Sequence, residues 1–532
     1  MTASSNSSTA PITPPGRHWP GRLITLLAVF LGGAALCVAG LLYLQRPLAV
    51  EVFSVDAAAP IPVERVRLRD RDDFRAHFLL LHGYGGNRRQ LRHLAQVLAA
   101  GGADVYFIDL PGRGDHTGPA SPRPEQGLYA AMPTPRETEA ALAVFHALER
   151  RGVPRERLVL VGHSLGGGVA VDVARRTLPA ATVSLAGLER RVDPGRPRHL
   201  LLITSRLEPP PLLHAADQMH RQSGGPASAR REFFGTHSTL PYQSNVQQAI
   251  LEWAVRTLGA RLETPPWLNE KLLALKLGAL VFLGFAFLPL AALAGFRLGH
   301  EPFGEVVSET RISNWSPPQL AGFALLGALA SVSALSLVAW LLWPNPLAWL
   351  RLADGDYLAS VMLLSTLWLL PALRNPPWVR DLREVRSCLL AAAGLAAFVI
   401  VVCGGFLTWE LFDLWPTPGR WGRALALLLV LFPYALGEEL LRRTFSKQGG
   451  KSPLTPFLLW RLALLAAIAY GSLLLGSGEG LLVLASVPLL LLSLIEYWLT
   501  ETTHRALGSV YAAAAFKALL LAWFFASFFP LR

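Results

Sequence analysis

Long uninterrupted apolar runs stand at both ends of a mixed central region. Residues 23–44 carry no charged side chain. As an α-helix these residues extend about 33 Å, enough to cross a hydrocarbon core of about 30 Å. Runs of the same kind recur after residue 271. The pattern predicts a transmembrane helix over residues 22–46 and an all-α, polytopic membrane domain of about eight helices over residues 272–532.

Basic residues gather at one set of ends of the predicted spans. The eight C-terminal spans are expected at residues 272–294, 319–342, 357–373, 388–410, 422–441, 456–476, 480–499 and 507–529. The basic groups are Arg17 with Arg22, then Arg374, Arg380, Arg383 and Arg386, then Arg442, Arg443, Lys447 and Lys451. With nine alternating spans, all three groups fall on one side, which the positive-inside rule makes cytoplasmic. We therefore predict a multi-pass membrane protein with residues 50–261 outside the cytoplasm, on the periplasmic side of the inner membrane in a bacterial cell.

Residues 50–261 follow a different pattern, in which short apolar runs are separated by longer amphipathic stretches. Strands are expected at residues 77–81, 103–108, 158–161, 182–185 and 200–204. Such alternation is typical of a mostly parallel sheet with crossover helices. Before this domain, the Ser-, Thr- and Pro-rich residues 1–21 are predicted to be a disordered cytoplasmic tail. After it, residues 262–271 form a Pro-containing linker.

Composition narrows the choice of partners. Hydrophobic residues make up 52% of the 532 residues, and only 16% are charged. The formal net charge is +12, but the sequence has no basic patch interleaved with aromatic residues, so membrane topology rather than nucleic-acid binding explains the excess. Cys37, Cys388 and Cys403 lie within or at the edge of apolar segments. We expect neither a disulfide framework nor a cysteine metal site.

A serine between glycines is the first candidate for chemistry. The segment 162–166, Gly-His-Ser-Leu-Gly, ends a predicted strand and opens a helix-like pattern. A serine in such a place is held on a sharp turn with its hydroxyl exposed. Two earlier strands end in glycine-rich loops, HGYGG at 82–86 and DLPGRGD at 109–115. All three loops are expected at one sheet edge, which makes Ser164 a candidate nucleophile.

The motifs HGYGG, DLPGRGD and GHSLGG, in this order and spacing, resemble the α/β-hydrolase family over about 200 residues. The resemblance implies an α/β-hydrolase fold and a catalytic triad in the chain order nucleophile, acid, histidine. Those positions correspond to Ser164, to Glu208 four residues beyond Thr204, and to His237 before an amphipathic helix. Asp217 is an alternative acid.

By the same resemblance, the backbone N–H groups of Tyr84 and Leu165 would form the oxyanion hole. His163 and Gly83 are candidate substrate-binding residues. About a dozen residues separate the strands near 185 and 200, too few for the usual helical cap. We expect a serine esterase or lipase-like enzyme without cofactor or metal, acting on small-molecule or lipid esters. An acyltransferase on the same triad, or a non-catalytic sensor coupled to the membrane domain, are the alternatives.

The membrane half contains a second motif. Glu438, Glu439 and Arg443 resemble the first motif, E-E-x-x-x-R, of the CAAX-protease and bacteriocin-processing family. The resemblance implies a candidate membrane-domain site at these residues, although the later histidine motifs of that family are not matched. The alternative is that both glutamates pair with adjacent arginines. Glu496 and Lys517 are further ionisable groups in predicted spans, either functional or paired.

Overall fold

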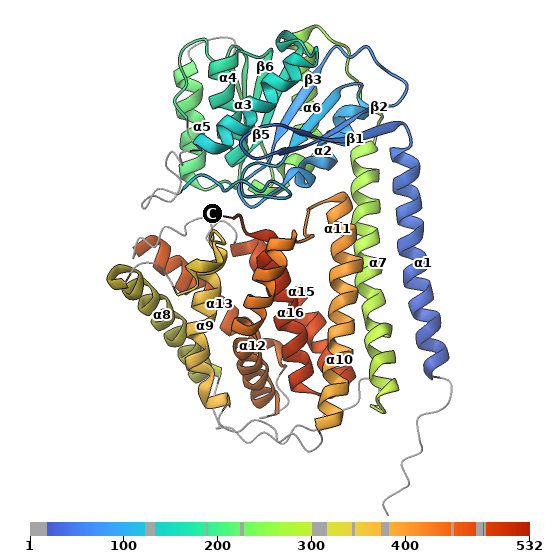
Figure 1. Cartoon of the computed structure of the whole chain (residues 1–532), viewed down its shortest axis with the longest axis vertical. Helices are drawn as coiled ribbons and strands as arrows, with labels where there is room; N and C mark the ends of the chain where they lie inside the picture. Colours follow the sequence, from blue (N-terminus) through green and yellow to red (C-terminus); the bar gives the residue numbers. More distant parts are fainter. Residues whose placement is uncertain are drawn as a thin grey trace, which may run out of the picture.

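The computed structural model describes residues 19–122, 134–187, 190–223, 228–300, 317–342, 346–373, 382–447, 452–474, 482 and 486–531. An α/β domain stands on a helical membrane domain, and helices α1 (Trp19–Gln45) and α7 (Leu268–Arg297) connect the two (Figure 1). The carboxyl-terminal residues return to the underside of the α/β domain (Figure 1). Segments distant in the sequence therefore meet at the boundary between the two parts.

The α/β domain is built on one eight-stranded sheet, in the order β1-β2-β4-β3-β5-β6-β7-β8. The strands are β1 (Leu48–Val55), β2 (Ile61–Leu68), β3 (His77–Leu81), β4 (Asp104–Ile108), β5 (Leu158–His163), β6 (Ala181–Leu185), β7 (Leu200–Ser205) and β8 (Ser228–Phe233). β1 and β2 pair antiparallel with their neighbours, and every pair from β4 to β8 is parallel. The predicted mostly parallel sheet is confirmed.

Helices cover both faces of this sheet. They are α2 (Arg92–Ala100), α3 (Pro135–Arg150), α4 (Leu165–Thr177), α5 (Pro210–Ser223) and α6 (Ser244–Leu258). Apolar side chains of α2 and α6 form one core with alternate residues of the central strands, and those of α3 and α4 form the other. The five central strands are completely buried. Because both of their faces are covered, these strands are the continuous apolar runs visible in the sequence.

Three strands were not predicted, and all lie toward the edges of the sheet. β1 and β2 alternate apolar and polar residues because they are antiparallel and partly exposed. β8 has the sequence SARREF, and none of its residues is buried. A search for continuous apolar runs passes over such strands. Between β6 and β7 the described residues form no helix, in line with the predicted minimal cap.

The membrane domain contains helices at all of the predicted spans, as far as these are described. After α7 come α8 (Pro317–Leu342), α9 (Gly355–Leu373), α10 (Leu382–Phe398), a π-helical turn (Val399–Cys403), α11 (Gly404–Glu410), α12 (Pro418–Lys447), α13 (Leu454–Leu474), α15 (Ser486–Leu507) and α16 (Val510–Phe528). Within the described residues, six helical segments are long and apolar enough to cross a membrane. Residues 322–337 and 355–369 form shorter apolar helices. This is a multi-pass membrane architecture, whereas the count of nine spans stays a prediction.

Part of the sequence predictions lies outside the described residues. The structure does not describe residues 1–18 of the predicted tail or most of the first part of the predicted span 480–499. It also does not describe Arg374, Arg380 and Lys451.

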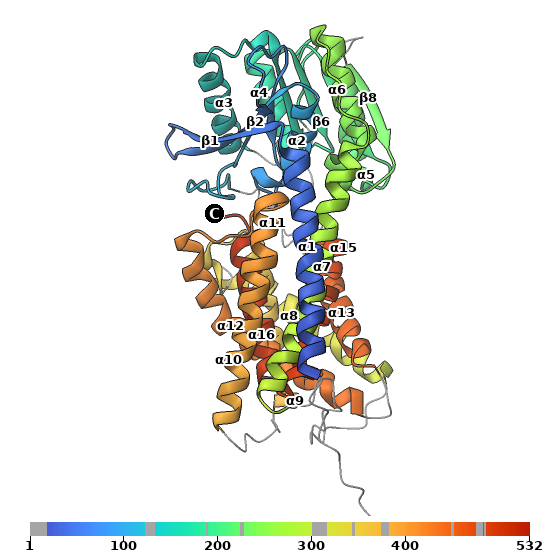
Figure 2. The same cartoon turned by 90° about the vertical axis from the view of Figure 1, so that its right-hand side faces the viewer.

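Helices α1 and α7 lie side by side and lead into and out of the α/β domain (Figure 2). Small residues allow the close approach: a Cβ added at Gly33 would come within 2.6 Å of the Phe282 ring. Lower in the pair, Phe30 stacks on Phe285 with ring centroids 5.7 Å apart. Close packing at small residues is the usual way in which membrane helices associate. The α/β domain is thus tethered at both of its ends by one packed helix pair.

Candidate active site

Ser164 stands at the apex of a strained turn between β5 and α4. Its backbone has φ 54° and ψ −119°, a conformation that non-glycine residues rarely adopt. Glycines on both sides are required, since a Cβ at Gly162 would lie 2.0 Å from the Gly166 carbonyl oxygen and one at Gly166 would lie 2.2 Å from that of Leu81. The strand, the tight turn and the helix together fix the place of this serine at the carboxyl edge of the sheet.

The structure brings His237 and Glu208 into direct contact. Glu208 follows β7, and His237 opens a short 3₁₀ helix (His237–Tyr242) after β8. His237 Nδ1 lies 2.9 Å from Glu208 Oε2 and 3.1 Å from Oε1. Since a carboxylate only accepts, the ring donates from Nδ1, which leaves Nε2 as the nitrogen that can take a proton. The Glu208 side chain is completely buried, while the His237 side chain is 20% exposed.

Asp217, the alternative acid, lies elsewhere. It belongs to α5 and forms an ion pair of 2.7 Å with Arg230 on β8. Its side chain is 44% exposed. The carboxylate that meets His237 is that of Glu208.

His163 lies behind His237. Its Nε2–H donates to the His237 carbonyl oxygen over 2.9 Å, and the two ring centroids are 5.0 Å apart. Burial, and secondarily the nearby His237, lower the pKa of His163 to about 3, so this ring is neutral. Only 2% of His163 is exposed, which makes it a support for the His237 loop. Direct contact of His163 with substrate stays a prediction.

Gly83 packs against the serine turn from the side of β3. A Cβ at Gly83 would come within 3.3 Å of the Ser164 Cβ and 3.1 Å of His163 Nδ1. Any side chain here would crowd the Ser164 turn. The loops after β3 and β5 thus meet as the sequence predicted, although a contact of Gly83 with substrate is untested.

The two residues expected to supply the oxyanion hole lie on these loops. Leu165 is the first residue of α4, and the first N–H groups of a helix have no acceptor within it. Tyr84 lies in a turn closed by a bond of 3.1 Å from Gly86 N–H to the Gly83 carbonyl. Arg113 fixes this turn by donating from Nε to the Tyr84 carbonyl over 2.6 Å. Their role as oxyanion donors stays a prediction.

Buried polar groups hold the loops after β3 and β4 together. His82 Nδ1–H donates to the Gly83 carbonyl over 2.8 Å, and Nε2 accepts from Leu110 N–H over 3.0 Å. Burial, followed by the charge of Arg113, lowers the pKa of His82 to about 3, which keeps the ring neutral. Asp109 accepts backbone N–H bonds from Arg88 and Asp115, at 2.7 and 2.9 Å. His82 and Asp109 therefore stabilise the loops.

The membrane-domain glutamates belong to a buried ion-pair network of four carboxylates and four cations. Its members are Glu438, Glu439, Arg442 and Arg443 on α12, Arg461 on α13, Glu496 and Glu501 on α15, and Lys517 on α16. Lys517 Nζ lies 2.9 Å from Glu438 and 3.2 Å from Glu496. Glu439 pairs with Arg442 and, at 3.1 Å, with Arg443. The network joins four helices, and its carboxylates are engaged by cations.

A histidine also lies near this network. His504 of α15 is 4% exposed and interacts electrostatically with Glu439 and Arg443. Among the residues that the structure describes, however, no three His, Cys, Asp or Glu side chains group together as metal ligands would. The geometry around Glu438 and Glu439 is that of charge pairing between helices.

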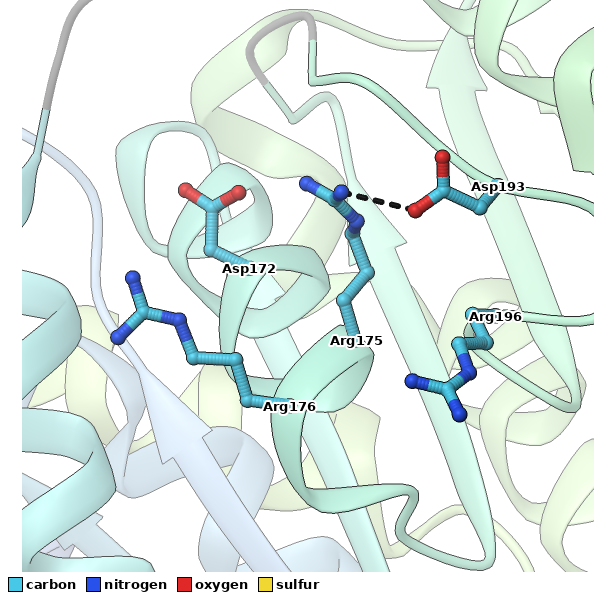
Figure 3. A pocket seen from close by; sticks show the side chains of 5 residues that line it. All are labelled: Asp172, Arg175, Arg176, Asp193 and Arg196. Atoms are coloured by element: carbon cyan, nitrogen blue, oxygen red, sulfur yellow. Dashed lines mark hydrogen bonds and ion pairs between the residues drawn. The ribbon is translucent and has the colours of Figure 1, made fainter.

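A separate hollow opens on the α/β domain, and Ser164 is not among the residues that line it. Asp172, Arg175 and Arg176 of α4 line it, together with Asp193 and Arg196 of the loop between β6 and β7 (Figure 3). Arg175 bonds to Asp193 over 2.8 Å, and Arg176 bonds outward to Glu139 over 2.7 Å. Carboxylates thus engage two of the three arginines, and we assign this hollow no part in the candidate site.

Comparison with known proteins supports the fold. Residues 76–216 match a family model described as alpha/beta hydrolase fold. The dihydrolipoyllysine-residue acetyltransferase component of the acetoin cleaving system of Cupriavidus necator is 31% identical over 156 residues, which are 28% of this chain and 37% of that protein. The chain therefore spans little more than a third of this curated relative.

Solved structures similar to this chain include a hormone-sensitive lipase from a metagenome library, 19% identical with a TM-score of 0.31. It aligns over 46% of this chain and 99% of that one. An esterase/lipase from an uncultured bacterium is 18% identical, with a TM-score of 0.29. The alignment covers 43% of this chain and 86% of that one. The family match and the sheet topology show that the central domain has the α/β-hydrolase fold.

Proposed function

We propose that this α/β-hydrolase domain works as a membrane-anchored serine hydrolase that cleaves carboxylic esters through Ser164, Glu208 and His237. The observation that carries the proposal is the contact of 2.9 Å between His237 Nδ1 and the buried Glu208 carboxylate. A histidine oriented in this way presents Nε2 toward a nucleophile. The strained turn holds Ser164, the proposed nucleophile, at the same sheet edge.

Each residue has a defined role in this reaction. His237 takes the hydroxyl proton of Ser164 while the oxygen attacks the ester carbonyl, and then gives the proton to the leaving alcohol. Glu208 fixes the tautomer and stabilises the imidazolium that forms. Water then cleaves the acyl-enzyme by the same steps. The N–H groups of Leu165 and Tyr84 would stabilise the oxyanion, typically by about 3 kcal/mol per donor.

Apolar surroundings favour lipid esters as substrates. Leu207 precedes Glu208 and is 57% exposed, and Phe234, three residues before His237, is 73% exposed. Exposed apolar side chains beside a site are typical of surfaces that meet apolar ligands or membranes. Since the domain is tethered to membrane helices, the proposed substrate is an ester presented at the membrane surface, outside the cytoplasm.

Covalent labelling tests the nucleophile. A fluorophosphonate probe should label the purified full-length protein at Ser164, located by mass spectrometry, because His237 raises the nucleophilicity of that hydroxyl. Ser164→Ala and His237→Ala should each lose labelling by at least about 100-fold. Asp217→Asn is the matched control and should be labelled like the wild type. Folded wild-type protein that remains unlabelled would contradict the proposal and favour a non-catalytic hydrolase-like domain.

Acyl transfer is the second candidate, because the 31% identical relative is named as an acetyltransferase component. Both reactions pass through the same acyl-enzyme and differ in whether water or an alcohol accepts the acyl group. Product analysis with and without an added alcohol separates them. Hydrolysis predicts free acid as the main product in both cases, whereas acyl transfer predicts a new ester.

A further inference from the structure

Aromatic rings of the membrane domain lie beneath the turn that carries Tyr84. The Phe528 ring, at the end of α16, comes within 3.1 Å of the position that a Cβ on Gly85 would occupy. Phe528 stacks on Phe524 and on Phe412, with ring centroids 4.9 and 5.6 Å apart. All three phenylalanines are half-buried, so part of each residue is uncovered. We call Phe412, Phe524 and Phe528 the aromatic wall.

On one side, Asn87 fixes the aromatic wall to the turn. Its Nδ2 donates to the Asp413 carbonyl, and its Oδ1 accepts from Asp413 N–H, each over 3.1 Å. Asn87 follows the Gly83–Gly86 turn directly, and Asp413 follows Phe412. These two bonds fix the position of the loop after β3 relative to Phe412.

On the other side, the last residues of the chain bond to the loop after β4. Leu531 N–H donates to the Gly112 carbonyl over 2.8 Å, and Ala120 N–H donates to the Leu531 carbonyl over 3.1 Å. Arg420 of α12 is 3% exposed and donates to the carbonyls of both Phe529, at 2.8 Å, and Gly112, at 3.1 Å. Paired backbone bonds and a buried guanidinium therefore set the position of Phe528 relative to the α/β domain.

Such a wall suits one class of ligand. Half-covered aromatic rings lower the free energy of an apolar group laid against them, by about 25 cal/mol for each Å² removed from water. A small polar acyl group has little apolar area to bury against the rings and gains little free energy from them. The described residues between β6 and β7 form no helix that could supply an apolar cover. Phe528 also terminates a helix that is apolar enough to cross a membrane.

Building on the proposed esterase function, we propose that the aromatic wall is the acyl-chain-binding surface of the ester site and that Phe528 determines specificity for long acyl chains. The ester carbonyl would lie at Ser164, and its acyl chain would run past the Gly83–Gly86 turn onto rings supplied by the membrane domain. The substrate class is the fatty-acyl ester of a membrane lipid. The membrane domain would then be part of the substrate site as well as an anchor.

A comparison of acyl-chain lengths tests this inference. The full-length protein in one detergent is assayed with p-nitrophenyl butyrate and p-nitrophenyl decanoate. Phe528→Ala should raise KM for decanoate by about tenfold with kcat retained, because the lost contact serves binding. Butyrate turnover and fluorophosphonate labelling of Ser164 should change by less than about twofold. Phe528→Leu, which keeps an apolar side chain, should restore most of the decanoate KM.

Phe285→Ala is the matched control, because Phe285 of α7 is a half-exposed phenylalanine that also contacts other aromatic rings, those of Phe30 and Trp498. It should leave both esters unaffected. Equal losses for butyrate and decanoate in Phe528→Ala would mean that Phe528 only supports the turn, and an unchanged profile would remove it from the site. Either result overturns the inference while labelling of Ser164 upholds the proposed function. Absence of both labelling and turnover in the wild type would overturn the two together.

Discussion

At the scale of residues, His237 is held from two directions. Glu208 accepts from its ring at 2.9 Å, and the neutral His163 donates to its backbone carbonyl, also at 2.9 Å. Glu208 is completely buried, and a buried carboxylate is costly unless it is paired. The pair with His237 meets this requirement and at the same time orients the imidazole. One contact therefore serves both stability and the proposed chemistry.

Exchange of the two candidate acids for their amides separates them. Glu208→Gln removes the charge that stabilises the imidazolium and allows the wrong tautomer, so kcat for ester hydrolysis should fall by about 10³-fold or more. Asp217→Asn only breaks a half-exposed ion pair with Arg230 and should change kcat by less than about twofold. Steady-state kinetics on a soluble ester measure both. The reverse ranking would make Asp217 the acid.

The sequence predicts Ser164, Glu208 and His237 as candidates because each lies just beyond a strand or at a loop with a recognisable local pattern. It carried no signal for Asn87 against Asp413, or for Gly85 against Phe528. These partners are more than 300 positions apart, and a lone asparagine or phenylalanine has no motif. Their contacts depend on how two domains meet, which local periodicity does not encode.

At the scale of elements, the sequence predicted those strands that are buried on both faces of the sheet. The central strands appear as apolar runs because helices cover both sheet faces. β8, with its two arginines, has no such cover, and its polar sequence hides its pairing with β7. In the membrane half, α15 carries Glu496 at its middle and Glu501 and Arg505 in its second half. The two carboxylates pair with cations of neighbouring helices. Hydropathy counts these residues as charged, so it underestimates how readily the helix packs inside the membrane domain.

The turn between α11 and α12 yields a pH-dependent prediction. Burial, followed by the charge of Asp115, raises the pKa of Asp413 from 3.8 to about 6. A carboxyl with a raised pKa in the folded state costs stability as the pH rises from about 4 through 6, and the cost is complete above that range. Asp413→Asn should therefore stabilise the protein by about 3 kcal/mol at pH 8, with the gain shrinking toward pH 4.

The thermal unfolding midpoint of the full-length protein at several pH values measures this gain. Asp56→Asn, at an exposed position, is the control and should give no pH-dependent change. Asn at 413 keeps the backbone bonds to Asn87, because these involve only the main chain of residue 413. A midpoint that is lower at pH 8 than in the wild type would show that the Asp413 charge stabilises the interface.

At the scale of the whole molecule, the carboxyl terminus and the α/β domain share one side. Leu531 bonds to Gly112, whereas α7 descends from the domain and ends at Arg297 on the opposite side (Figure 1). From the positive-inside rule we predict that the shared side is the outer one. This arrangement agrees with an odd number of crossings between Trp19 and Leu531.

Reporter fusions in a bacterial host test that orientation. Alkaline phosphatase, which is active only outside the cytoplasm, should be active when fused after Arg261 or after Leu531 and inactive after Gly299. A reporter active only in the cytoplasm should give the opposite pattern. Cytoplasmic activity at Arg261 would overturn the topology, and different sides for Arg261 and Leu531 would contradict the contacts at Gly112.

The bonds between Leu531 and the loop after β4 also bear on the order of biogenesis. Synthesis delivers the α/β domain first, while Leu531, which bonds to its loop at Gly112 and Ala120, is translated after every intervening helix. The domain can collapse around its sheet early, but this loop gains its final hydrogen-bond partners only when the membrane half is in place. We expect an esterase built in this way to mature late, so that a chain stalled during membrane insertion does not yet act on the surrounding lipids.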